Sequence, residues 1–134
     1  MADPAEVLGR SKTIAVVGFS QHPSKTAHAV PVQLIAAGFN VIPVNPNATE
    51  ILGRTSYPTL NDVSEPIDLV NVFRPSEFTP EVARRAVQVG AKALWLQQDI
   101  VSEEARRIAT DAGLDYIEDT CIAVVRSVYR ITRH

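Results

Sequence analysis

The sequence has little cysteine, little net charge and no long hydrophobic run. Cys121 is the single cysteine in 134 residues, which excludes an internal disulfide framework and a zinc site built from several cysteines. Thirteen Lys and Arg against fifteen Asp and Glu give a net charge of -2, so no nucleic-acid partner is expected. No apolar run approaches the ~18–20 residues of a membrane span. Because the first residues also lack the pattern of a signal peptide, we expect a cytoplasmic protein without membrane association.

The length and composition are typical of a folded globular protein. Hydrophobic residues make up 46% and charged residues 21% of the chain, which excludes disorder as the default state. At about 100–200 residues per domain, the length predicts a single domain over residues 1–134. A domain of this size buries roughly two-thirds of its unfolded surface and can fold without disulfides or structural metal ions.

Five apolar segments are typical of buried parallel strands, because their hydrophobic residues run continuously instead of alternating with polar ones. They span residues 13–18, 40–44, 68–73, 92–96 and 115–117. Four segments between them have helical spacing, at residues 30–37, 80–89, 102–112 and about 122–130.

The positions of proline and glycine decide how the two remaining segments, residues 19–29 and 45–66, are interpreted. Pro31 fits the first turn of a helix that begins near residue 29 or 30, and it would break a helix running in from Thr26. We therefore expect residues 19–29 to form a long loop with at most a partial turn. Residues 45–66 contain several prolines and one glycine, and we expect a crossover loop with room for one short helix.

The alternation of strands and helices predicts an α/β fold. We expect a Rossmann-like, doubly wound, mainly parallel sheet of about five strands with helices on both faces. Such a sheet binds its ligand at the carboxyl ends of the strands, where the strand order switches. The candidate site residues are therefore those that follow Val17, Val44, Val72 and Leu96.

The segment after the first strand has the features of a phosphate-binding loop. Gly18 lets the backbone approach a ligand closely, Ser20, Ser24 and Thr26 supply hydroxyl groups, and Lys25 supplies a positive charge. Backbone amides near the start of the next helix can point at an anion. An ordinary polar loop is the alternative.

Two elements of a dinucleotide site are missing. The fingerprint needs further glycines where Ser20 and Pro23 stand. It also needs an acid after the second strand to bind a ribose, and this sequence has Asn45-Pro46-Asn47 there. Both departures argue against NAD, and no Walker A sequence is present either.

The next two strand ends also offer ligand contacts. The rigid segment Pro43-Val44-Asn45-Pro46 can hold a flat adenine by shape, with the Asn45 amide as donor and acceptor, or it is simply a stiff turn. Arg74 stands at the end of the third strand, where a guanidinium suits a phosphate, and a surface ion pair with Glu77 is the alternative.

No catalytic or metal-binding constellation is predicted. His22 and His28 lie in or beside the first loop, but no acid stands at a spacing that would partner either as a general base. No set of histidines and carboxylates has metal-ligand spacing. Trp95 is expected in the core, and Gln97 and Gln98 are candidate contacts to amide groups of a ligand.

Four motifs occur in a defined order at the strand ends: Val-Val-Gly-Phe-Ser, Pro-Val-Asn-Pro, Val-Phe-Arg-Pro and Ala-Leu-Trp-Leu-Gln. Together they resemble the stand-alone CoA-binding domain family of small bacterial and archaeal proteins. This family is similar to the N-terminal domain of the succinyl-CoA synthetase alpha subunit. The resemblance covers roughly residues 10–125 and implies a Rossmann-like sheet that binds coenzyme A at its strand ends.

The resemblance also implies the binding residues. Three groups correspond to the family's CoA contacts: Gly18, Phe19, Ser20 and Gln21 at the phosphates; Val44, Asn45, Pro46, Phe73, Arg74 and Pro75 around the adenosine; and Leu96, Gln97 and Gln98 in a further segment. Ala48 stands where the synthetase has a lysine, so Lys25, Arg54 or Arg74 would meet the 3′-phosphate. The synthetase's phosphorylated histidine lies in a second domain, so we expect no ligase chemistry.

The expected function is therefore a CoA or acyl-CoA binding protein without catalytic activity of its own. An NAD(P) or other adenine-nucleotide module and a small CoA-dependent acyl transferase are the alternatives. Cys121 begins the last predicted helix, on the side where the resemblance implies the CoA thiol. It is either a thiol that reacts with CoA disulfide or a buried, inert side chain. The sequence predicts no particular protein partner.

Overall fold

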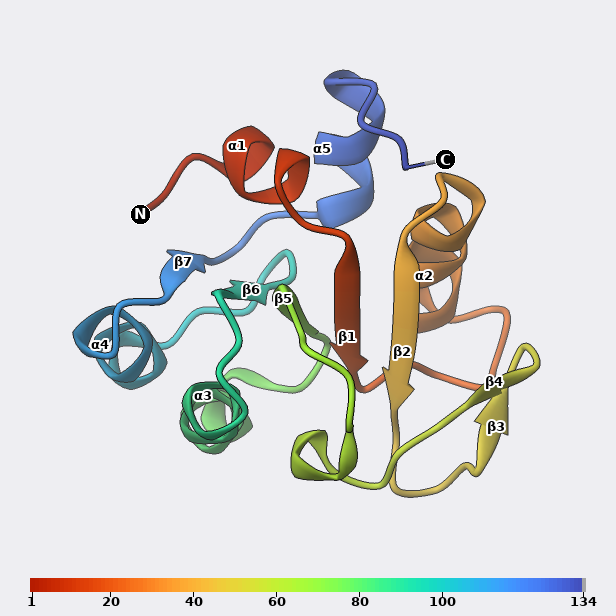
Figure 1. Cartoon of the computed structure of the whole chain (residues 1–134), viewed down its shortest axis with the longest axis horizontal. Coiled ribbons are helices and arrows are strands. Elements are labelled where there is room, and N and C mark those ends of the chain that lie inside the picture. Colours follow the sequence, from red (N-terminus) through yellow and green to blue (C-terminus); the bar gives the residue numbers. More distant parts are fainter. Residues whose placement is uncertain (134) are drawn as a thin grey trace.

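A parallel sheet forms the centre of the computed structural model, which describes residues 1–133 (Figure 1). In these residues the sheet has five strands in the order β2-β1-β5-β6-β7. The strands are β1 (Thr13–Val17), β2 (Asn40–Val44), β5 (Leu69–Val72), β6 (Ala93–Leu96) and β7 (Asp115–Ile117). Each predicted strand is confirmed to within one residue at either end. All residues of β5 and β6 are buried, which explains their continuous apolar sequence.

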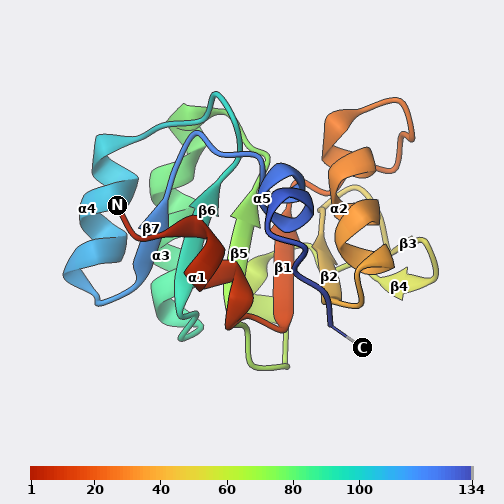
Figure 2. The ribbon, with the colours of Figure 1, turned by 90° about the horizontal axis from the view of Figure 1, so that it is seen from above.

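Helices cover both faces of the sheet (Figures 1 and 2). One face carries α1 (Pro4–Gly9), α2 (Thr26–Ala36) and α5 (Ile122–Val128). The other face carries α3 (Thr79–Gln88) and α4 (Glu103–Asp111). The Rossmann-like doubly wound fold expected from the sequence is therefore confirmed. Helix α1, where Asp3 caps the first amides, was not predicted.

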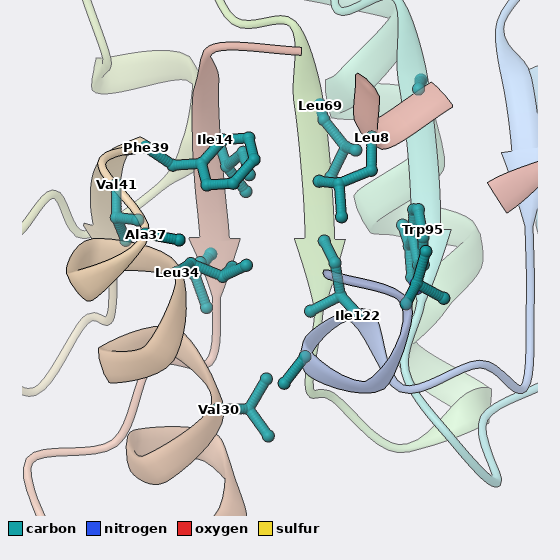
Figure 3. Close-up of a cluster of buried hydrophobic side chains, with 14 of the residues drawn as sticks. Leu8, Ile14, Val30, Leu34, Ala37, Phe39, Val41, Leu69, Trp95 and Ile122 are labelled. Atoms are coloured by element: carbon teal, nitrogen blue, oxygen red, sulfur yellow. The ribbon is translucent and has the colours of Figure 1, made fainter. Parts of the chain in front are cut away.

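The core consists of two hydrophobic clusters, one on each side of the sheet. Ile14 and Val16 of β1 point into the first cluster, and Ala15 between them points into the second. Figure 3 shows the first cluster, in which side chains from α1, α2 and α5 meet those of the strands. Trp95 lies fully buried in this cluster, as expected.

The prediction of a long loop over residues 19–29 is wrong. Helix α2 begins at Thr26 and continues through Pro31 to Ala36. Pro31 lacks an N–H, so it removes one hydrogen bond of the helix and does not end it. The ring of Pro31 is buried, and we infer that packing against the core offsets the lost bond.

The crossover between β2 and β5 contains more structure than the sequence predicted. A hairpin of β3 (Glu50–Ile51) and β4 (Arg54–Thr55) is followed by the 3-10 helix η1 (Leu60–Asp62). A second 3-10 helix, η2 (Ser76–Phe78), lies outside the crossover, between β5 and α3. Between β4 and η1, Tyr57 pairs with Val44 at the outer edge of β2. The crossover thus covers part of an edge strand that would otherwise expose its backbone.

Candidate ligand-binding site

A cavity of about 710 Å³ opens at the carboxyl ends of β1, β2 and β5. Its volume falls within the ~300–1,000 Å³ of typical small-molecule sites. The chain passes from β1 to β2 on one side and then crosses to β5 on the other side of β1, so the cavity lies where the strand order switches. The β1–α2 loop, the segment around η1 and the first turns of α3 complete its walls.

Most of the predicted site residues line this cavity. They are Gly18, Ser20, Gln21, Lys25, Val44, Asn45, Pro46, Phe73 and Arg74. The lining described for residues 1–133 does not include Phe19, Pro75, Leu96, Gln97 or Gln98. The cavity also has lining residues that were not predicted: Val17, His22, Ala27, Asn47, Pro58, Thr59, Leu60, Phe78, Glu81, Val82 and Arg85. Val17 and Asn47 adjoin predicted residues, whereas the η1 and α3 residues carry no local signal in the sequence.

Gly18 connects β1 to the loop in a backbone conformation that favours glycine. Its φ is +91°, and a Cβ at this position would lie 3.4 Å from the Phe73 backbone. Its N–H donates to the Val44 carbonyl at 2.9 Å, so the strand ladder continues to the cavity edge. The absence of a side chain here leaves the backbone open to a ligand.

The β1–α2 loop is fixed to the start of α2 through Ser20. The Ser20 N–H donates to the Ala27 carbonyl at 3.0 Å, and the His28 Nδ1 lies 2.7 Å from the Ser20 carbonyl, to which it donates. His28 is buried and meets the Phe19 ring edge to face at 5.8 Å. Phe19 is therefore a core residue whose side chain anchors the loop. The His28 ring packs against Phe19 and holds the Ser20 carbonyl.

Asn45 joins the two loops that border the cavity. Its Nδ2 donates to the Phe19 carbonyl at 2.9 Å, and its Oδ1 accepts the Asn47 N–H at 2.8 Å. Gln21 adds a bond from Nε2 to the Asn47 carbonyl at 3.3 Å. Both polar atoms of the Asn45 amide thus have protein partners. A hydrogen bond from this amide to an adenine, as predicted, would compete with these two bonds.

The positive charges of the cavity are distributed over two opposite walls. Lys25 occupies the N-cap position of α2 and makes no side-chain capping bond. Arg74 stacks over the Phe78 ring with its Cζ 4.7 Å from the ring centre. Among the ion pairs of residues 1–133, neither Lys25 nor Arg74 has a carboxylate partner, so the alternative of an Arg74–Glu77 pair is not found. Arg54 lies on β4 outside the cavity lining.

One acidic side chain lines the cavity within the described part of the chain. This is Glu81 in the first turn of α3, whose carboxylate pairs with Arg84 at 3.4 Å and with Arg85 Nε at 3.3 Å. Arg85 also donates to the Asn61 Oδ1 at 2.7 Å, which ties α3 to η1. Arg84 pairs with Glu104 as well, at 2.9 Å, so the two arginines of α3 face two carboxylates. Within residues 1–133, Lys25 and Arg74 are therefore the cavity-lining cations without a carboxylate partner.

Gln97 lies inside the protein, where it supports α5. Its Oε1 accepts the Ile122 N–H at 3.2 Å and a bond from the Asn71 Nδ2 at 3.4 Å. Gln98 is exposed, and Cys121 is half-buried beside the first core cluster without lining the cavity. Both alternatives for Cys121, reaction with CoA disulfide and an inert side chain, stay predictions.

The titratable groups with shifted pKa values lie on α4 and β7, away from the cavity. Burial raises the pKa of Tyr116 well above its usual value, and its hydroxyl donates to the Glu118 Oε1 at 2.8 Å. A hydrogen bond from Arg106 lowers the pKa of Glu103. Within residues 1–133 no cluster of three metal-ligating side chains is found, and no helix is long and apolar enough to cross a membrane.

Comparison with known proteins relates the whole sheet to CoA-binding proteins. Residues 12–127 match a family model described as a CoA binding domain. The uncharacterized protein YneT of Bacillus subtilis (strain 168) is 43% identical over 127 residues, which cover 95% of this chain and 94% of YneT. The ADP-forming acetate–CoA ligase II of Archaeoglobus fulgidus is 32% identical over 98 residues, which cover 72% of this chain and 15% of the ligase.

Solved structures show the same arrangement. A hypothetical protein from Pyrococcus horikoshii OT3 has a TM-score of 0.90 at 36% identity, and the match covers 96% of this chain and 89% of that one. The dinucleotide-forming acetyl-coenzyme A synthetase 1 of Candidatus Korarchaeum cryptofilum has a TM-score of 0.72 at 28% identity, with 87% of this chain and 28% of the synthetase covered. With the family model and the near-complete match to YneT, these likenesses show that the chain belongs to the CoA binding domain family, as its four strand-end motifs predict.

Proposed function

We propose that this chain binds CoA or acyl-CoA in the cavity at the carboxyl ends of β1, β2 and β5, without catalytic activity of its own. The observation that carries the proposal is the position of the cavity. It lies at the switch point of the sheet, between Gly18 and the first turn of α2. Helix N-termini and glycine-containing turns of this kind bind phosphate groups in related folds.

The start of α2 is the proposed site of the pyrophosphate. The first amides of any helix lack intrahelical partners, and the helix dipole places partial positive charge there. Lys25 at the N-cap adds a full charge, and Gly18 leaves room for the ligand against the backbone. The residues present therefore fit the diphosphate of CoA in both charge and space.

The lining of the cavity favours CoA over NAD as the ligand. A dinucleotide site of this fold binds a ribose through an acid at the end of the second strand. At that place the cavity has Asn45, whose amide bonds to other parts of the protein, and the acidic Glu81 on α3 is already paired with arginines. NAD would thus find no free carboxylate, whereas CoA does not need one.

The likeness to CoA ligases supports binding more than ligation. The chain spans between 12% and 21% of the length of the curated acetate–CoA ligases that it matches. We propose that CoA binding is the property shared with that part of the ligases. The Nδ1 of His28, the buried histidine next to the cavity, donates to the Ser20 carbonyl and so holds the ring in the loop structure.

Calorimetric titration tests the proposal on the purified protein. CoA should bind, and NAD should bind at least about tenfold more weakly, because it lacks the 3′-phosphate and so at least one charge-assisted hydrogen bond of about 1.5–3 kcal/mol. Tighter binding of NAD than of CoA would contradict the proposed ligand.

Arg74 is proposed as the partner of the 3′-phosphate. The pyrophosphate occupies the α2 wall with Lys25, which leaves the free guanidinium on the opposite wall for the second anionic group. Arg74→Ala should weaken CoA binding by about 1–3 kcal/mol and leave dephospho-CoA binding nearly unchanged. Arg54→Ala, outside the cavity lining, is the matched control and should affect neither ligand. An equal loss for both ligands in Arg74→Ala would remove the 3′-phosphate from Arg74.

A further inference from the structure

Helix α2 has an unusual hydrogen bond in its first turn. Pro31 stands within the helix and has no N–H to donate to the carbonyl four residues earlier, which belongs to Ala27. That carbonyl accepts a bond from outside the helix, from the Ser20 N–H at 3.0 Å. The bond that a helix residue at position 31 would ordinarily make is thus replaced by one from the β1–α2 loop.

The Ser20 backbone is held at two points by the same helix. Besides the N–H bond to Ala27, its carbonyl accepts the bond from His28, whose ring is buried against Phe19. Ser20 and Ala27 both line the cavity. Any change at the Ala27 carbonyl therefore acts directly on the wall where the ligand phosphates are proposed to bind.

We propose that Pro31 is a positioning residue for the β1–α2 loop. Because it withholds an N–H from the Ala27 carbonyl, the Ser20 N–H meets no competing helix donor there, and the loop is held in one conformation before ligand arrives. A proline in a helix interior is strongly unfavourable relative to alanine, so helix stability alone does not favour it. The consequence for CoA rests on the proposed function, whereas the consequence for the loop does not.

Replacement of Pro31 by alanine tests the inference. The new N–H can bond to the Ala27 carbonyl and compete with Ser20, so hydrogen exchange of the Ser20 amide in the ligand-free protein should accelerate by about 3–10-fold, the effect of one hydrogen bond. CoA affinity should fall by a similar factor of about 3–10, although α2 itself gains a bond.

Two further variants separate this role from plain packing. Pro31→Val restores the same N–H and keeps a buried apolar side chain of about the size of proline, so an exchange effect shared by Pro31→Ala and Pro31→Val follows from the N–H and not from the lost packing of the ring. Val32→Ala, at an exposed position of the same helix, should leave Ser20 exchange unchanged. An unaltered Ser20 exchange rate in both Pro31 variants would overturn the inference. Since exchange is measured without ligand, failure of CoA to bind the unmodified protein would instead count against the proposed function.

Discussion

Gly18→Val is expected to abolish CoA binding at concentrations that saturate the unmodified protein, a loss of at least about hundredfold or about 2.7 kcal/mol. Gly18 lines the cavity at the end of β1, and a valine side chain would occupy the space against the Phe73 backbone. Its φ of +91° also disfavours any β-branched residue, so the free energy of unfolding should fall by about 1–3 kcal/mol. Titration calorimetry and chemical denaturation measure the two effects separately.

Gly113→Val is the matched control for this prediction. Gly113 has a similar φ of +85°, no atom within 4 Å of the point where a Cβ would lie, and no place in the cavity lining. It should lose comparable stability and retain CoA affinity. If Gly18→Val binds CoA as tightly as Gly113→Val does, the phosphates do not lie at Gly18.

Trp95→Ala is expected to give the largest loss of stability, about 3–5 kcal/mol. The indole is fully buried between the sheet and α5, and its Nε1 donates to the Thr120 carbonyl at 2.9 Å. Removal leaves a large cavity and an unpaired carbonyl just before α5. Because this is the single tryptophan, unfolding must be followed by far-ultraviolet circular dichroism instead of intrinsic fluorescence.

Trp95→Phe distinguishes the two contributions. It retains most of the buried apolar volume and loses the bond to Thr120, so it should be destabilised by about 1–3 kcal/mol, the penalty for an unsatisfied buried acceptor. If Trp95→Ala were no less stable than Trp95→Phe, the side chain would not fill the core as described.

The strands could be predicted because both faces of the sheet are covered. Burial on both sides requires continuous apolar segments, and β1, β2 and β5 appear in the sequence as such runs. The predicted start of α2 was too late because Pro31 is typical of the first turn of a helix. In the structure the helix begins earlier, and the Ala27 carbonyl, which Pro31 cannot bond, accepts the Ser20 N–H instead. A rule based on local propensity cannot anticipate a bond made by the preceding loop.

The β3–β4 hairpin and the α3 wall of the cavity could not be predicted from local sequence patterns. The turn of the hairpin is Leu52-Gly53, with φ values of 53° and 74°, and leucine is an unusual residue for the first of these positions. Glu81 and Arg85 reach the cavity because α3 follows β5 closely, and their sequence shows only the exposed face of an amphipathic helix. The strand-end residues were found because a parallel sheet gathers them at one edge.

A crystal structure of the protein with CoA tests the central claim most directly. The account predicts density for the pyrophosphate at the first turn of α2 beside Gly18 and Lys25, with the 3′-phosphate near Arg74 on the opposite wall. Density for CoA at another surface, such as the small pocket between Asp68 and Lys92 at the amino ends of the strands, would contradict it.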